Sequence, residues 1–327
     1  MCYNSTVKQN ISNVSQMKEA IMAELAYLLH EKHILESRLK RMIYGSIEIR
    51  DTGSKKCIYV HRREGGLQVT KYVGEYSNEL NSTIIENNAL AKDLKKRLRL
   101  VNKELFSLNY LNQDLNDRVK LNIDLARKHM VDSIYKQAML EGVVTTYSDT
   151  EAIVNGGKVK DMNATDITKI INLKHSWEFI LDENVISYPT SFPVLTQING
   201  LVEEGLSYSA GKVRAFPVSI GGSTYIPPIP LEYQIKEDLL EILNKEISLE
   251  TAIELILFVM KKQIFTDGNK RTAVIFANHY MISHGLGIIV IPAELVDEYK
   301  KLLVLYYEDR NLVSIKDFLK DKCVISF

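Results

Sequence analysis

The 327-residue sequence is poor in cysteine, with three, and in tryptophan, with one, and its formal net charge is zero. Cys2, Cys57 and Cys323 are too widely spaced for a zinc-ligand set or a disulfide framework, so they are expected to be reduced thiols. No apolar run approaches the roughly 18 residues that a membrane-spanning helix needs. The first residues also lack the basic segment and following apolar stretch of a secretory signal. These absences predict a cytoplasmic protein that does not enter a membrane.

The residues that are present have an ordinary composition but an uneven charge. Apolar residues make up 46% and charged residues 25%, which is typical of a globular protein, and the length allows two domains or one large one. Residues 1–120 contain 20 Lys and Arg against 14 Asp and Glu, whereas the remainder contains 21 against 27. The first part is therefore basic and the rest acidic. Either the first part contacts nucleic acid or the two parts attract each other.

Two segments, about residues 15–42 and 80–108, repeat apolar positions at alternating spacings of four and three, which indicates helices with a heptad seam. The seam positions are Ile21, Leu25, Leu28, Lys32, Leu35, Leu39 and Met42, then Leu80, Ile84, Asn87, Ala91, Leu94, Leu98, Val101, Leu105 and Leu108. Two matched seams predict an antiparallel helical hairpin, or pairing between two copies of the chain in a homo-oligomer.

Between these helices the pattern changes to three short strands, 46–50, 57–61 and 67–73, separated by turn residues. We predict a three-stranded β-meander, and with the helices it forms a coiled-coil and β-meander module over residues 1–112. Basic residues cluster around the strands: Arg38, Lys40, Arg41, Lys55, Lys56, Arg62, Arg63 and Lys71. They suit a nucleic-acid or acidic-partner surface, or the solvated face of a small sheet, and we favour the solvated face. Residues 113–132 are predicted as a helical connection.

The candidate functional residues form one loop between two apolar helical runs. It reads Gln-Ile-Phe-Thr-Asp-Gly-Asn-Lys-Arg-Thr-Ala over residues 263–273. Gly268 permits a tight turn and Asn269 is a good N-cap for the following helix. The free backbone N–H groups of that helix, with Lys270 and Arg271, predict a phosphate-binding site.

Asp267 precedes this helix start, where its carboxylate suits a Mg²⁺ ion that bridges phosphates. The whole string resembles the signature of the Fic/Doc (Fido) family, His-Pro-Phe-x-(Asp/Glu)-Gly-Asn-(Gly/Lys)-Arg. The matching residues are Phe265, Asp267, Gly268, Asn269, Lys270 and Arg271. The resemblance implies a mainly α protein with a Fic-fold helical domain over residues 133–327.

The resemblance also implies a function of the adenylyltransferase type: binding of ATP and Mg²⁺, and transfer of AMP to a hydroxyl side chain of a target protein (AMPylation). Gln263, Asp267, Asn269 and Arg271 would be catalytic; Gly268, Asn269, Lys270 and Arg271 would bind the nucleotide; Asp267 would bind the metal.

Two residues depart from the signature. Ile264 replaces its proline, and Gln263 replaces the histidine that serves the family as general base. A glutamine amide has no titratable proton near neutral pH, so we expect activity to be weakened or lost. The alternatives are a nucleotide-binding pseudoenzyme that recognises a partner, and a Doc-like kinase that transfers the γ-phosphate, since Gly-Asn-Lys-Arg-Thr-Ala also resembles the Doc branch.

A hairpin is predicted upstream of the signature, with residues 211–220 leading into a Gly-Gly turn and residues 223–228 returning. It resembles the Fic flap, which binds a target segment by adding it as a β-strand. The flap residues are Ile220, Gly221, Gly222, Ser223, Thr224 and Tyr225.

A degenerate inhibitory motif is the last feature. Glu141-Gly142 resembles the end of the family's self-inhibitory Ser/Thr-x-x-x-Glu-Gly/Asn helix, although Gln137 stands where Ser or Thr is expected. The arginine that normally anchors such a glutamate would fall at Val274, so the brake would lack its usual anchor. The alternative interpretation is a helix end capped by glycine.

Overall fold

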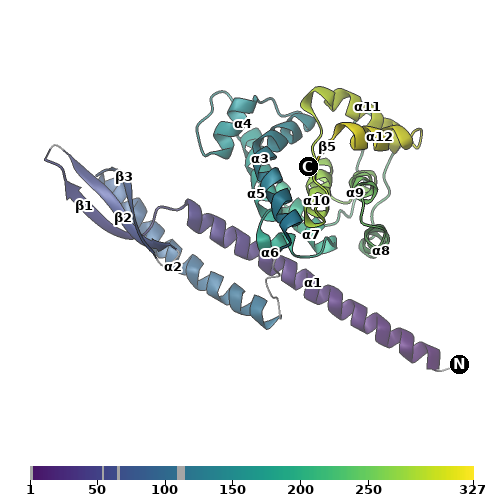
Figure 1. Cartoon of the computed structure of the whole chain (residues 1–327), viewed down its shortest axis with the longest axis horizontal. Coiled ribbons are helices and arrows are strands. Elements are labelled where there is room, and N and C mark those ends of the chain that lie inside the picture. The colour runs from purple at the N-terminus through teal and green to yellow at the C-terminus, as the bar shows by residue number, and fades with distance from the viewer. Residues whose placement is uncertain (1–2, 54, 65–66, 109–114) are drawn as a thin grey trace. The chain divides into compact units, whose positions relative to one another are not determined.

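The computed structural model describes residues 3–53, 55–64, 67–108 and 115–327 (Figure 1). The chain forms two compact units, residues 1–111 and residues 112–327. Both are dominated by helices, with short antiparallel strands, which confirms the predicted mainly α fold class. Of the helices in the described ranges, none combines the length and the apolar character that crossing a membrane requires.

The first unit is a helical hairpin with a sheet at its connection. Its elements are α1 (Tyr3–Arg41), β1 (Ser46–Asp51), β2 (Lys56–Glu64), β3 (Leu67–Glu75) and α2 (Asn78–Ser107). The strands pair antiparallel in the order β1-β2-β3, with a register shift between Ile58 and Tyr59. The β-meander prediction is confirmed. Ile58 and Val60 of β2 pack with Ile84 of α2, so one face of the sheet is covered by the start of that helix.

The two long helices of this unit run antiparallel, as the matched seams predict. Arg97 donates hydrogen bonds of 2.5 and 2.7 Å to the carboxylate of Glu31, and Asn87 donates to the carbonyl of Ile43. Half of the sixteen seam positions are buried: Leu28, Leu35, Leu39, Ile84, Ala91, Leu94, Val101 and Leu105. The seam is therefore used inside one chain, although Ile21 at its far end is exposed.

The second unit contains the remaining elements. These are α3 (Asp117–Leu140), α4 (Tyr147–Val154), α5 (Ala164–Ile180), α6 (Glu183–Ile186), α7 (Phe192–Val202), α8 (Glu232–Leu243), α9 (Leu249–Lys262), α10 (Asn269–Ser283), β4 (Ile288–Ile289), η1 (Ala293–Leu295), α11 (Val296–Tyr307), α12 (Val313–Lys322) and β5 (Val324–Ile325). Side-chain caps start several of the helices: Asn116, Thr146, Asn163 and Ser248 each accept a backbone N–H two or three residues into the first turn. Strands β4 and β5 pair antiparallel.

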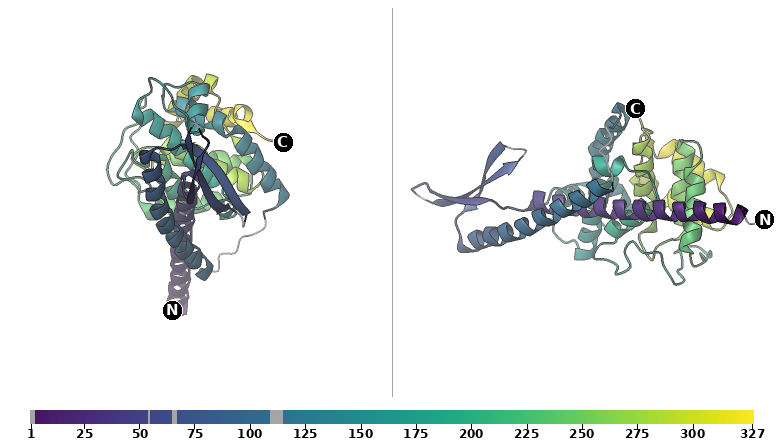
Figure 2. Two further views of the ribbon diagram at one scale, coloured as in Figure 1. Left: turned by 90° about the vertical axis from the view of Figure 1, so that its left-hand side faces the viewer. Right: turned by 90° about the horizontal axis from the view of Figure 1, so that it is seen from below.

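Helix α10 is the centre of this unit. It packs against α3, α5, α7 and α9, and Figure 2 gives two further views of the ribbon. Nearly all of its residues are buried, including five polar or charged ones. Asn278 bonds both the carbonyl and the N–H of Ile289, which ties β4 to the helix. Burial lowers the pKa of His279 to about 4, and its ring contacts the Val185 carbonyl and the Thr190 hydroxyl, so this histidine is a neutral core residue.

The predicted flap hairpin is not a β-hairpin in this structure. Residues 203–231, which connect α7 to α8, contain turns, among them one at Gly221 and Gly222, but no strand. The physical reason lies in the backbone bonding. Pro227 and Pro228 have no N–H to donate, and their carbonyls accept hydrogen bonds from the guanidinium of Arg214 instead of from a neighbouring strand.

Candidate functional site

A cleft of about 830 Å³ lies at the N-terminus of α10, which is within the usual size of a small-molecule site. The predicted loop forms one wall, and α11 with the residues after it forms another. The lining residues are Glu141, Val218, Ser219, Ile220, Gly221, Gly222, Gln263, Thr266, Asp267, Asn269, Lys270, Lys300, Lys301, Leu303, Val304, Leu305, Tyr307, Glu308 and Arg310. The structure thus brings the signature loop, the flap turn and Glu141 to one cavity.

The loop between α9 and α10 is held by its own side chains. Gln263 ends α9 in the left-handed region, with φ of 46°. The prediction that Asn269 is the N-cap is wrong, because Gly268, with φ of 74°, occupies that position and Asn269 is the first residue of α10. The Asn269 side chain accepts from the Phe265 N–H at 3.0 Å and donates to the Phe265 carbonyl at 2.8 Å. It therefore closes the loop rather than capping the helix.

The side chain of Gln263 lines the cleft at the position of the missing base. Its amide nitrogen donates to the Met260 carbonyl at 2.6 Å, and its amide oxygen accepts from Asn269 at 3.3 Å. Arg214 donates to the Gln263 backbone carbonyl at 2.5 Å, which fixes the end of α9. Nearby Tyr307 is no substitute for a base, since burial raises the pKa of its phenol well above the usual value.

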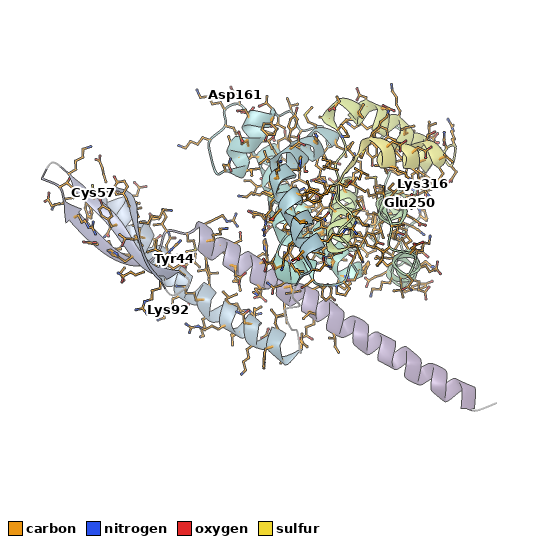
Figure 3. The ribbon with its side chains drawn as sticks, viewed as in Figure 1. Tyr44, Cys57, Lys92, Asp161, Glu250 and Lys316 are labelled. Carbon is orange, nitrogen blue, oxygen red and sulfur yellow. The ribbon has the colours of Figure 1, made fainter. Side chains whose placement is uncertain are left out.

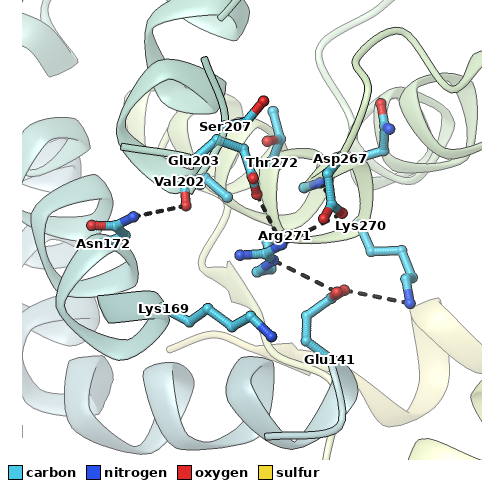
Figure 4. A network of polar contacts seen from close by, with 12 residues as sticks. Glu141, Lys169, Asn172, Val202, Glu203, Ser207, Asp267, Lys270, Arg271 and Thr272 are labelled. Carbon is cyan, nitrogen blue, oxygen red and sulfur yellow. Dashed lines mark hydrogen bonds and ion pairs between the residues drawn. The ribbon is translucent and has the colours of Figure 1, made fainter. Parts of the chain in front are cut away.

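Arg271 lies in a buried cluster of carboxylates rather than on the cleft wall (Figure 4). Its side chain is 2% exposed, and one terminal nitrogen lies 2.9 Å from an oxygen of Glu203. Its Nε lies 3.7 Å from Glu141, and Asp267 is also 3.7 Å away. Nε and Nη1 have no hydrogen-bond partner within the described chain. In this arrangement Arg271 faces protein carboxylates, whereas the sequence predicts that it faces phosphates.

Glu203 is a functional candidate that the sequence reasoning missed. It follows the last residue of α7 and is 2% exposed. Burial, reinforced by Asp267 and Glu141 and opposed by Arg271, raises the pKa of this carboxyl to about 7. A side chain at Gly268 would meet it, because an added Cβ would lie 2.6 Å from Glu203 Oε1. The sequence did contain a signal for it. An acidic side chain at the C-terminus of an apolar helix is disfavoured by the helix dipole, so its presence there indicates that a cation pairs with it.

We predict that Glu203 makes the protein less stable as the pH rises. Its pKa is about 7 in the folded protein against 4.5 for the free side chain, so between these values the folded state binds more protons. The free energy of unfolding should then fall by about 2–3 kcal/mol from pH 4.5 to pH 7.5 through this group. Urea unfolding across this range would measure the slope.

The comparison variant for this prediction is Glu203→Gln, which keeps the side-chain volume and cannot ionise. It should reduce the pH dependence of the free energy of unfolding by about the amount that Glu203 contributes. Glu183→Gln, on the short exposed α6 start, serves as the control. A variant Glu203→Gln with the same slope as the parent would contradict the assignment.

Glu141 ends helix α3 and also lies beside the signature loop. Gly142, with φ of 75°, donates to the Met139 carbonyl and ends α3 as a glycine cap. The carboxylate of Glu141 also reaches Lys270 at 3.4 Å and Arg271 at 3.7 Å. The usual arginine is absent, as expected from Val274, and cations of the signature itself lie beside the carboxylate instead.

Gln137, one turn before Glu141, has a structural role. Its side-chain oxygen accepts a hydrogen bond of 3.0 Å from the indole of Trp177. Both residues are buried, so this contact holds α3 to α5. The position that carries Ser or Thr in the inhibitory helix is thus occupied here by a core residue.

The flap turn is fixed by a residue at the end of α11. Glu308 accepts hydrogen bonds from the Thr224 N–H and hydroxyl, both 3.0 Å, and from Ser223 at 3.3 Å. These bonds lower the pKa of the Glu308 carboxyl. The ring of Tyr225 lies nearly parallel to that of Tyr307, with centroids 6.5 Å apart. The flap segment is ordered by these contacts in place of strand pairing.

Asp267 fits a Mg²⁺ site that relies on phosphate ligands. Its side chain is 70% exposed and lines the cleft. Within the ranges that the structure describes, no three His, Cys, Asp or Glu side chains converge on a possible metal position. Mg²⁺ is commonly held by one or two carboxylates together with phosphate oxygens and water, so a single exposed aspartate is compatible with it.

Comparison with known proteins gives a consistent result. Residues 191–281 match the family model described as Fic/DOC family, and these residues run from the start of α7 through most of α10. No curated protein matches the chain.

Several solved structures resemble the chain at low sequence identity. A Fic domain containing signaling protein from Bacteroides thetaiotaomicron has a TM-score of 0.51 and 19% identity, with 67% of this chain and 90% of that chain covered. A Fic family protein from Desulfovibrio desulfuricans has a TM-score of 0.50 and 16% identity, with 59% and 61% covered. Fic-1 from C. elegans has a TM-score of 0.48 and 18% identity, with 74% and 79% covered. The first two likenesses show a shared fold.

Proposed function

We propose, from the premise that residues 191–281 form a Fic/DOC family domain, that the cleft binds ATP with Mg²⁺ and supports AMP transfer to a hydroxyl of a target protein, at a rate reduced by Gln263. One observation carries the proposal. The N-terminus of α10, Asp267, Lys270 and the side chain at position 263 all meet in the same cleft.

The phosphates would lie against the first turn of α10. The first backbone N–H groups of a helix have no partner within it, and the helix dipole favours an anion there. Lys270 and Asn269 line the cleft beside this turn. Three further cations that the signature does not include, Lys300, Lys301 and Arg310, line it as well. With Lys270 these make four cations against three acids, Glu141, Asp267 and Glu308, so the lining is slightly positive, which favours an anionic ligand such as a triphosphate.

Asp267 would hold Mg²⁺, which would neutralise charge on the phosphates. The protein itself would position the groups: the closed loop keeps Asn269 and Lys270 in place, and the flap keeps a target segment near position 263. Such positioning and electrostatic stabilisation do not need a base. A positioned general base typically contributes about 10²–10⁴-fold, and Gln263 cannot supply this part.

Glu141 would oppose nucleotide binding. Its carboxylate lines the cleft and lies 3.4 Å from the amine of Lys270. A phosphate that approached Lys270 would meet this negative charge and would have to displace it. Glu141 therefore would act as a brake on the site, anchored by Lys270 and Arg271.

The target would be a protein segment that lies along the flap. Val218, Ser219 and Ile220 line the cleft, and their backbone groups are outside any strand. The side chain of Ile226 is 73% exposed next to this segment. The Ile220 carbonyl accepts from the Ser223 N–H, so an extended target segment would bind through the other backbone groups of this segment and cover the apolar side chain.

Calorimetric titration of the full chain with ATP and Mg²⁺ tests the binding step. We expect a dissociation constant of about 1 mM or lower, and about tenfold tighter binding by Glu141→Ala, because one negative charge beside the phosphates is removed. Glu151→Ala, an exposed acid on α4, is the matched control and should bind like the parent. No heat of binding from folded parent and Glu141→Ala at millimolar nucleotide would reject the proposal.

A further inference from the structure

A basic hollow in the first unit shares no lining residue with the cleft at α10. It measures about 490 Å³ and lies between the connection from α1 to β1, strand β2 and helix α2. Figure 3 labels Tyr44 and Lys92, two of its residues. The lining residues are Tyr44, Gly45, Ser46, His61, Arg62, Arg63, Asn88, Ala91, Lys92 and Lys95.

The floor of this hollow is held in place by specific contacts. Asn88 accepts from the Gly45 N–H at 2.7 Å and donates to the Gly45 carbonyl at 3.0 Å. The Tyr44 ring is approached by the guanidinium of Arg62 at 5.2 Å and by the amine of Lys95 at 4.6 Å. Cations from the sheet and from the helix therefore converge on one tyrosine.

The positive charge continues from the hollow along α2. Lys92, Lys95, Lys96, Arg99 and Lys103 are all exposed. At about 100° per residue these five side chains fall within about 100° of the helix circumference and extend over about 16 Å of its length. Among the described residues, none of the five is in an ion pair.

The acidic residues of α2 lie on a different face. Glu86, Asp93 and Glu104 fall together, about 60° or more around the helix from the nearest of the five cations. The apolar residues Leu94, Val101 and Leu105 are buried on the remaining side. Helix α2 therefore has separate apolar, acidic and basic faces, and only the basic face is continuous with the hollow.

We propose that the hollow and the basic face of α2 form a docking surface for the phosphate backbone of a nucleic acid. Evenly spaced cations with no acid among them complement a ligand of uniform negative charge. A protein partner usually presents both signs of charge, and this face has no carboxylate to meet a partner's cations. A membrane surface would require a continuous exposed apolar face, whereas the exposed apolar side chains of α2, Ile85, Leu90, Leu100 and Phe106, are scattered around the helix.

The contacts of this surface are to phosphates rather than to bases. Tyr44 is half-buried and is engaged by Arg62 and Lys95, so its ring is not offered as a stacking platform. Arg62, Arg63, Lys92 and Lys95 surround the hollow, and Lys96, Arg99 and Lys103 extend the path. Binding should therefore depend strongly on salt and little on sequence.

Fluorescence anisotropy of the full chain with a labelled mixed-sequence DNA duplex tests the surface. If the five helix cations each neutralise one phosphate, the slope of log affinity against log salt is about −4.5, which is roughly 500-fold weaker binding at 200 mM than at 50 mM salt. The triple variant Lys92→Ala, Lys96→Ala, Arg99→Ala should bind at least about tenfold more weakly and lose about 2.7 from the slope.

Two further variants make the test specific. The control triple Lys128→Ala, Lys158→Ala, Lys160→Ala removes three exposed cations of the second unit and should bind DNA like the parent. The charge-preserving triple Lys92→Arg, Lys96→Arg, Arg99→Lys should also retain binding, because phosphate contacts need charge more than shape. Circular dichroism of each variant verifies that these exposed substitutions leave the fold intact.

The proposal is overturned if the parent chain does not bind the duplex at about 50 mM salt, a concentration at which phosphate contacts are strong. It is also overturned if both alanine triples weaken binding equally, because binding would then depend on the total charge of the chain and not on the basic face of α2. Poly-glutamate and phosphatidylserine vesicles serve as the acidic-polymer and lipid probes. Equal or tighter binding of either one than of the duplex would reject the nucleic-acid assignment.

Discussion

Replacement of Gln263 by histidine, together with Ile264→Pro, is expected to raise the labelling of protein from ATP by about 10²-fold or more. Position 263 lines the cleft beside Asn269 and Lys270, so an imidazole there would face the proposed phosphates and an incoming hydroxyl. The proline should be tolerated at the backbone, because the contact of Ile264 is made by its carbonyl, which accepts from Arg214 N–H at 3.0 Å.

Radiolabelled ATP separates the possible reactions. Label from the α-phosphate on a lysate protein or on the chain itself would indicate AMP transfer, whereas label from the γ-phosphate alone would indicate the Doc-like kinase reaction. Gln263→Ala with Ile264→Pro is the control, since it alters the same loop without adding a base. If the restored variant transfers neither label while it still binds ATP, the pseudoenzyme alternative is preferred.

Replacement of Arg271 by methionine is expected to reduce the free energy of unfolding by about 3–5 kcal/mol at pH 8, the usual cost of leaving a buried charge without its partner. Arg271 and Glu203 are each 2% exposed and lie 2.9 Å apart. Methionine keeps most of the volume, so the loss reports the charge rather than a cavity. At pH 5.5 the cost should be smaller, because Glu203, with a pKa of about 7, is mostly protonated there.

Urea unfolding of four proteins measures this coupling as a double-mutant cycle: the parent, Arg271→Met, Glu203→Gln and the double variant. Since the two residues are in contact, the double variant should recover a large part of the stability lost in Arg271→Met. Arg310→Met, at an exposed position on the cleft wall, is the matched control. Additive losses, or a loss below about 1 kcal/mol in Arg271→Met, would contradict the proposed role of the pair.

The buried pair also bears on how the nucleotide site works. Arg271 is held by Glu203, Glu141 and Asp267, so it contacts three carboxylates rather than the cleft. Glu141, and Glu203 when it is ionised, would repel a triphosphate, whereas Asp267 would meet it through Mg²⁺. The loss of unfolding free energy in Arg271→Met and the gain in nucleotide affinity in Glu141→Ala should therefore be linked, because both depend on the same cluster of charges.

Much of the architecture could be predicted from local patterns. The seams over residues 15–42 and 80–108 predict an antiparallel hairpin, and Arg97 with Glu31 confirms it. The three short strands form the predicted meander. The signature loop between α9 and α10 indicates a Fic/DOC domain, and residues 191–281 match that family. Periodicity, turn residues and a compact motif each involve residues that are close together in the sequence, so they can be recognised before the fold is known.

The tertiary structure alone decided which distant side chains meet. It places Glu203 of the α7 end against Arg271, and it brings Glu141 to Lys270 although no arginine follows at Val274. It leaves the flap without strands, because Arg214 occupies the carbonyls of Pro227 and Pro228. It also adds Lys300, Lys301 and Arg310 to the cleft. These features depend on burial and on contacts between segments far apart in the chain, and the pKa of Glu203 rises mainly because packing removes it from water.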